Sequence, residues 1–255
     1  MHELITIAFS HYCEKARWAL DRNRVPYREH KYLPMVHRAA AKRALEGTGA
    51  GKADGASTRY STPILLGEPA PLADSSDIVR WAEPALYELE EADALDRWFS
   101  EDLGPHTRRV VYWFCFEDPR LLAWLAERNV SVPQSLLMKA AVPLGAARLM
   151  RRAMKVDRDG FERSLSKVRG IADEVGERLS DGRPYLAGDR FSAADLSFAA
   201  MMSPAICPPP SMYGAVLPPL SKLPPQAREL AEEMRAHPAG RFAMRMFEEQ
   251  RWAQA

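Results

Sequence analysis

FSHYCEKARWAL, residues 9–20, is the stretch that decides the fold. The residues that lead into it, 4–9, form a short apolar run that predicts a buried strand. From Cys13 onwards apolar residues recur at roughly helical spacing, and Ser10 is a favourable N-cap residue. A helix start offers unpaired N–H groups and a partial positive charge, and both stabilise an anion. The stretch therefore predicts a strand–helix junction that aims a hydroxyl and a thiol at one anion-binding spot, which suits thiolate chemistry.

The composition of the 255 residues narrows the class of protein. Basic and acidic residues nearly cancel, 35 against 34, so no overall field attracts nucleic acid or an anionic membrane. No secretory signal and no run of membrane-spanning length is visible. Cys13, Cys115 and Cys207 are far apart and odd in number, and no pair has zinc-ligand spacing. We therefore expect a cytoplasmic protein with no metal, no disulfide framework, no nucleic-acid partner and no membrane partner.

The first 83 residues alternate between strand and helix signals. A proline opens the strand at 62–66, glycines fill a loop at 47–61, and a helix begins near Asp74. The predicted order is strand 2–8, helix 12–23, strand 27–32, helix 35–45, strand 62–66, strand 71–73 and a helix from 74. This order predicts a small mixed sheet flanked by helices, with a right-handed first crossover.

Residues 84–255 carry helical periods and almost no strand signal. Ser192 and Asp195 form the sharpest capping signal, because the serine can cap the helix and the aspartate can reach back. Eight prolines between Pro204 and Pro225 exclude a regular helix there. The predicted helices are 85–103, 107–116, 121–128, 134–154, 161–179, 192–202 and 228–250. The chain therefore divides into an α/β domain, 1–83, and an all-helical domain, 84–255.

Four segments in this order resemble the soluble glutathione S-transferase family, and the resemblance covers nearly the whole chain. They are residues 10–20, residues 61–65 (STPIL), residues 72–78 (LADSSDI) and the Ser192–Asp195 capping box. The resemblance implies a thioredoxin-like N-terminal domain that binds glutathione and an all-α C-terminal domain that binds an apolar electrophile. It also implies a homodimer with a role in detoxification.

The resemblance assigns roles to particular residues. It makes Pro63 a cis-proline, whose tight turn exposes the Thr62 backbone to the cysteinyl amide of glutathione. Asp74 and Ser75 are expected to hold the γ-glutamyl end, the carboxylate facing the ammonium group and the hydroxyl facing the carboxylate. Ser10 occupies the position of the family's catalytic serine or cysteine, and is expected to stabilise the glutathione thiolate.

Two other classes of function remain open on the sequence. Cys13 follows Ser10 within one helical turn and can serve a glutathione-dependent thiol reductase, lyase or isomerase, or be a buried core residue. The alternative outside catalysis is a glutathione-binding or interaction protein that keeps the fold.

The rest of the pocket is less defined by the sequence. From the apolar run at 110–116, either Tyr112 or Phe116 is expected to face the pocket, and the sequence does not choose between them. Further candidates for contacts with the two substrates are Tyr12, His106 and Arg109 for the electrophile, and Lys42 and Arg43 for the glycyl carboxylate.

Overall fold

The first part of the chain is a three-stranded mixed sheet with helices on both faces. In the computed structural model, which describes residues 1–48, 50, 60–68 and 71–255, the strand order is β2-β1-β3. Strand β1 pairs with β2 in parallel and with β3 antiparallel, and α1 connects the parallel pair. The elements are β1 (His2–Ile7), α1 (His11–Arg22), β2 (Tyr27–Tyr32), α2 (His37–Leu45), β3 (Ile64–Leu66) and α3 (Ser75–Ala82).

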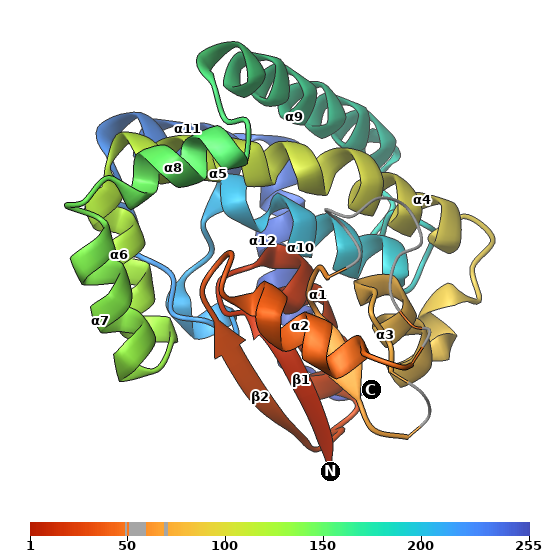
Figure 1. Cartoon of the computed structure of the whole chain (residues 1–255). Helices are drawn as coiled ribbons and strands as arrows, with labels where there is room; N and C mark the ends of the chain where they lie inside the picture. Colours follow the sequence, from red (N-terminus) through yellow and green to blue (C-terminus); the bar gives the residue numbers. More distant parts are fainter. Residues whose placement is uncertain (49, 51–59, 69–70) are drawn as a thin grey trace.

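Alternation along β1 assigns one face of the sheet to each helix layer. Leu4 packs with Ala16 of α1 and Ile78 of α3, whereas its neighbour Ile5 packs with Ala41 of α2. Consecutive residues of a strand point to opposite faces, so both faces of the sheet are covered. Figure 1 shows α2 in front of the strands, in the lower part of the view. This arrangement confirms the predicted α/β class.

The remainder of the described chain is helical and packs around α10. Its elements are α4 (Ala92–Trp98), a π-helical turn (Phe99–Leu103), α5 (Gly104–Glu117), α6 (Pro119–Asn129), α7 (Val132–Ala141), α8 (Ala146–Ala153), α9 (Arg158–Arg178), α10 (Ala193–Ile206), α11 (Pro225–Ala236) and α12 (Pro238–Gln250). Short 3₁₀ turns cover Pro84–Tyr87, Leu179–Asp181, Pro210–Met212 and Leu220–Lys222. Nearly every side chain of α10 is buried, so this helix forms the centre of the helical part (Figure 1).

Three of the predicted helices are interrupted. The helix predicted over 134–154 is two, α7 and α8, because Gly145 turns the chain with φ +89°. The helix predicted over 228–250 ends before His237, whose extended backbone is typical of a residue before proline, and α12 begins at Pro238. The helix predicted over 85–103 consists of the 3₁₀ turn, α4 and the π-helical turn.

The irregular segments fall where prolines and glycines predict them. The loop predicted over 47–61 lies largely outside the described residues, as does part of the turn after Gly67. The strand predicted at 71–73 is reduced to a single bridge between Leu65 and Leu72. Most of the proline-rich segment is irregular and contains two 3₁₀ turns. Its first residues differ from the prediction, because α10 continues through Pro204 to Ile206 instead of ending at 202. Within the described part of the chain, no helix is long and apolar enough to cross a membrane.

Candidate active site

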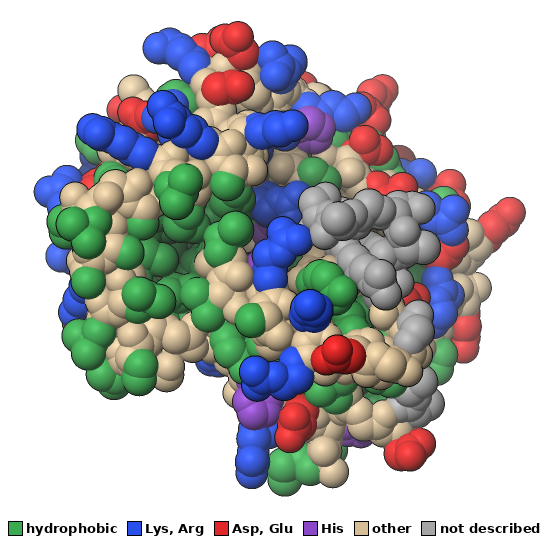
Figure 2. Space-filling model, viewed as in Figure 1, with side chains coloured by type: hydrophobic (Ala, Val, Ile, Leu, Met, Phe, Trp, Pro, Cys, Tyr) green, Lys and Arg blue, Asp and Glu red, His purple; other side chains and the backbone are tan. Residues whose placement is uncertain are grey.

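A cavity of about 390 Å³ lies between the sheet part and the helical part. Its walls come from residues 7–12, the start of α2, residues 61–62, α5, α6 and the segments around α11. Figure 2 shows hydrophobic side chains gathered around a hollow on this face of the molecule, beside α6, α7 and α8. The predicted strand–helix junction therefore opens into a concave site, as expected for a small-molecule pocket.

Ser10 lies at the wall of this cavity, between the end of β1 and the start of α1. Its backbone is extended, with φ −74° and ψ 130°, and its hydroxyl does not cap the helix. The carbonyl of Ser10 accepts the first helical bond, from Glu14 N at 2.9 Å. Because the hydroxyl is not used as a cap, it can donate to an anion held at the N-terminus of α1.

Cys13 does not line the cavity. It is fully buried, and its thiol donates to Thr62 Oγ1 at 3.6 Å. Burial raises the pKa of the Cys13 thiol, and the Arg17 charge and local hydrogen bonds offset only part of this effect. A shielded, protonated thiol is poorly suited to attack a substrate, so the structure favours the core-residue interpretation of Cys13.

The segment with the proline meets Ser10 at the cavity. The Thr62–Pro63 peptide bond is cis, as the resemblance implies. Thr62 lines the same cavity as Ser10, while Pro63 is buried behind it. The structure therefore brings together two of the predicted glutathione-binding segments, residues 10–20 and residues 61–65. The hydrogen bond between Cys13 and Thr62 joins them across a sequence separation of 49 residues.

Asp74 and Ser75 lie at the start of α3, outside the cavity lining. The Asp74 carboxylate caps the helix by accepting a bond from Ser76 N at 2.8 Å, and Ser75 is buried. Burial raises the pKa of Tyr12 to about 12, and the Asp74 charge contributes to this rise. Asp74 is thus close enough to act on a side chain that does line the cavity.

His11 and Arg108 supply polar groups that the sequence-based candidates did not include. His11 Nε2 donates to the Gly104 carbonyl at 3.0 Å, since that oxygen can only accept. Burial, with the Arg108 charge, lowers the pKa of His11 to about 3, so its ring is neutral at neutral pH. Gly104 begins α5, where a Cβ would overlap the Tyr12 phenol. Contact with Gly104, at the start of α5, therefore holds both aromatic side chains in place.

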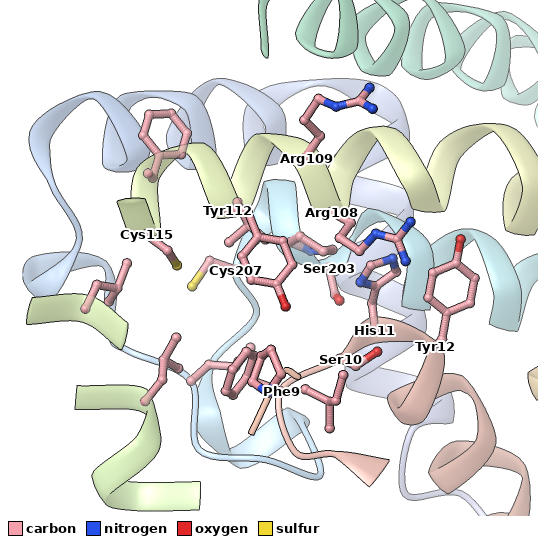
Figure 3. A pocket seen from close by; sticks show the side chains of 18 of the residues that line it. Phe9, Ser10, His11, Tyr12, Arg108, Arg109, Tyr112, Cys115, Ser203 and Cys207 are labelled. Atoms are coloured by element: carbon pink, nitrogen blue, oxygen red, sulfur yellow. The ribbon is translucent and has the colours of Figure 1, made fainter. Parts of the chain in front are cut away.

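The charged side chains around the cavity are all basic in the described part of the chain. Figure 3 shows Arg108 above His11, whereas the Arg109 guanidinium points away from the cavity. Arg109 donates to Ser164 at 3.1 Å, and His106 also contacts Ser164 instead of lining the cavity. Arg108 forms no ion pair with a described carboxylate, so an anionic ligand would find a cation there.

The start of α2 also differs from the expected ligand set. His37 and Arg38 line the cavity, whereas Lys42 and Arg43 lie farther along the helix, outside it. Burial lowers the pKa of His37 to about 4. The sequence does contain a signal for His37 and Arg38. They follow β2, which is parallel to β1, so they lie at the same edge of the sheet as Ser10, which follows β1.

The other end of the cavity is apolar. Tyr112, and not Phe116, faces it, and the two rings stack with their centroids 5.6 Å apart. Cys115 and Cys207 direct their sulfur atoms into this end (Figure 3), and burial raises their pKa values to about 12 and about 11. The cavity therefore combines a polar, basic end at Ser10 with an apolar end formed by the helical part.

Comparisons with known proteins agree with this architecture. Residues 9–85 match the family model described as glutathione S-transferase, N-terminal domain. Glutathione transferase F2 from Populus trichocarpa superposes with a TM-score of 0.62 at 14% identity, covering 99% of this chain and 95% of that one. A possible glutathione S-transferase from Rhodopseudomonas palustris gives 0.59 at 16%, covering 98% and 86%. A glutathione S-transferase from Ceriporiopsis subvermispora, in complex with glutathione, gives 0.56 at 14%, covering 98% and 97%. Among curated protein sequences, none matches the chain.

These findings confirm the resemblance drawn from the sequence motifs. The chain has the glutathione transferase fold over nearly its whole length. Its residues 9–85 are similar to the N-terminal domain of the glutathione S-transferase family.

Proposed function

We propose that this protein is a glutathione transferase that adds the glutathione thiolate to an apolar electrophile. The observation that carries the proposal is the position of Ser10. Its hydroxyl lies at a helix N-terminus without capping the helix, in a cavity that Thr62 also lines. The apolar end around Tyr112 lies within the same cavity and offers space for a second substrate. The burial of Cys13 weighs against the reductase, lyase or isomerase alternative that uses this thiol.

We assign the two substrates to the two parts of the chain. Residues 1–83 bind glutathione: the Thr62 backbone pairs with the cysteinyl amide, and Asp74 with Ser75 holds the γ-glutamyl end. Residues 84–255 bind the electrophile. Arg38 and Arg108 give the cavity a basic end suited to a peptide with two carboxylates. A homodimer, a cytoplasmic location and a role in detoxification are further predictions from the sequence.

Ser10 acts by favouring the ionised form of the glutathione thiol. A thiol with a pKa of about 8.5 is only about 3% ionised at pH 7. Lowering this pKa by ~2 units makes it mostly thiolate and corresponds to ~2.7 kcal/mol. One hydroxyl donor and the partial charge of a helix N-terminus are together of this magnitude. The thiol proton is released to solvent, and the thiolate sulfur forms a bond to an electrophilic carbon of the second substrate. In a substitution, the leaving group departs with the electron pair of the bond that breaks. In an addition to a double bond, the neighbouring atom takes up a proton.

Replacing Ser10 by alanine is expected to lower turnover far more than glutathione affinity. The hydroxyl contacts only the sulfur, so its loss costs about 2–3 kcal/mol, or roughly 30–150-fold in rate. The pKa of bound glutathione, followed by thiolate absorbance, is expected to rise. This measurement needs no knowledge of the natural electrophile, and turnover is measured with a panel of apolar electrophiles.

Cys13→Ala is the matched control for Ser10→Ala, because it removes the neighbouring sulfur, which does not itself line the cavity, and its weak hydrogen bond to Thr62. We expect it to leave the pKa of bound glutathione unchanged. Full activity in Ser10→Ala together with loss of activity in Cys13→Ala would show that the reaction depends on Cys13 and not on Ser10. Binding to immobilised glutathione with no conjugation by the unaltered protein would instead support the non-catalytic alternative.

The Asp74→Asn and Ser75→Ala variants are each expected to weaken glutathione binding, with the larger loss at Asp74. Asparagine caps a helix as well as aspartate does, so Asp74→Asn removes the charge that holds the ammonium group while α3 keeps its cap. Calorimetric titration with glutathione measures both affinities. Asp77→Asn, the same change at an exposed position of α3, is the control. Unchanged glutathione affinity in both variants would mean that Asp74 and Ser75 only begin α3 and do not bind glutathione.

A further inference from the structure

The outer surface of α7, α8 and the turn between them exposes an unusual number of large apolar side chains. Five of them are between 55% and 87% exposed: Val132, Leu136, Leu137, Leu144 and Leu149. Leu144, in the turn, is the most exposed of the five. Hydrophobic side chains gather over this part of the molecule in Figure 2. Large apolar side chains that are exposed in such number on neighbouring elements mark a site of interaction with another molecule or a membrane.

Cations accompany these leucines, and acids do not. Residues 129–156 contain five Lys and Arg residues and no Asp or Glu. Lys139 and Arg151 pair with Glu127 and Glu117 of the neighbouring helices, at 3.1 and 2.8 Å.

The other three cations of this segment, Arg148, Arg152 and Lys155, are exposed and form no ion pair with a described residue. The near-zero total charge of the chain hides this local excess. The α7–α8 surface, defined as residues 132–155, therefore presents leucines and unpaired cations together.

The arrangement of α8 separates these groups by face. Ala147 and Met150 point inward and pack with Tyr112 and Leu122 in a common core cluster. Arg148, Leu149 and Arg152 are exposed on the outer side. A helix with a packed inner face and an outer leucine flanked by arginines has the composition of helices that lie in a membrane interface.

We propose that the α7–α8 surface binds the anionic face of a lipid bilayer, with Leu144 and Leu149 entering the interfacial region and Arg148, Arg152 and Lys155 contacting phosphate groups. A second copy of the chain is a poorer occupant. A two-fold interface places the same patch on itself, which would bring these three cations toward their own copies. This inference goes beyond the proposed function and does not depend on it. It replaces, for this one surface, the expectation of no membrane partner.

The experiment is flotation of the full chain with two kinds of vesicle. One is pure phosphatidylcholine, and the other contains phosphatidylserine as well. We expect binding to the anionic vesicles only, and loss of that binding in ~1 M salt, where the Debye length falls to about 3 Å. Arg148→Ala and Arg152→Ala should each weaken binding about fivefold, since each surface cation contributes about 1 kcal/mol. Leu144→Ser with Leu149→Ser should weaken it at least as much.

A matched control removes the same residue type from another surface. Arg228→Ala, at an exposed position of α11, should leave vesicle binding unchanged. Glutathione affinity in the leucine variant reports that it is folded, because neither leucine lines the cavity. Absence of binding to anionic vesicles would overturn the proposal. A change of oligomeric state in the leucine variant, without vesicle binding by the unaltered protein, would overturn it in favour of a second copy.

Discussion

Replacing Lys15 by methionine is expected to lower the free energy of unfolding by about 3–5 kcal/mol, because it leaves a buried carboxylate without its cation. Lys15, on α1, forms an ion pair with Asp96 of α4, and the two side chains are 0% and 2% exposed. Asp96 also accepts hydrogen bonds from Ser197 Oγ at 2.6 Å and Tyr87 Oη at 2.7 Å. One carboxylate thus joins α1 to three segments of the helical part.

The matched control is Arg190→Met, which removes the cation of an exposed pair. Arg190 lies 2.8 Å from Glu88, and the side chains are 52% and 59% exposed. Pairs of this kind contribute about 0–1 kcal/mol. Denaturant unfolding measures both variants. If Lys15→Met costs no more than Arg190→Met, the buried pair does not hold the two parts of the chain together.

The same network predicts a pH dependence through Asp96. Burial alone would raise the pKa of this carboxyl, but Lys15 and the hydroxyl donors outweigh it and lower the pKa below its ordinary value. Its stabilising contribution is therefore complete above the unfolded pKa of about 3.9 and is lost as pH falls through the lower folded value. Asp96→Asn is expected to remove this part of the acid-induced loss of stability.

Polar residues on α1 limited how much of the packing could be predicted. Charged side chains are usually exposed, yet Glu14, Lys15 and Arg17 are almost fully buried. Glu14 accepts hydrogen bonds from Arg17 at 3.0 Å and from Arg251, more than two hundred residues away, at 2.6 Å. Partners this distant leave no local signal, so periodicity could identify the helix but not its neighbours. Only the tertiary fold explains these buried charges.

The sequence could predict those residues of the candidate site whose role follows from their neighbours along the chain. Ser10, at the N-terminus of a helix, and Thr62, before a proline, could be found from their own neighbours in the sequence. His11 and Arg108 could not, because their roles depend on the packing of α5 against α1. The choice between Tyr112 and Phe116 likewise depends on the rotation of α5, which the uniformly apolar run at 110–116 does not reveal.

Asp195→Ala is expected to be the other severely destabilising change, also at about 3–5 kcal/mol. The carboxylate is fully buried and accepts three hydrogen bonds: from Ser192 N at 2.8 Å, from Ser192 Oγ at 2.7 Å and from Leu186 N at 2.7 Å. The capping box predicted at Ser192 is present, and Leu186 N is a further donor from the preceding segment. Each donor that loses its acceptor in a buried place costs about 1–3 kcal/mol.

Asp157→Ala provides the comparison, because Asp157 caps α9 at an exposed position through one bond to Gly160 N, 2.7 Å long. A cap of that kind contributes about 1 kcal/mol. Unfolding in denaturant should therefore separate the two variants clearly, and refolding of Asp195→Ala should slow if α10 forms early. Glutathione affinity should persist in the folded fraction, since the proposed contacts lie in the first 83 residues. If Asp195→Ala lowers the free energy of unfolding no more than Asp157→Ala does, water has access to the start of α10. In that case α10 is not the fully buried central helix of the helical part.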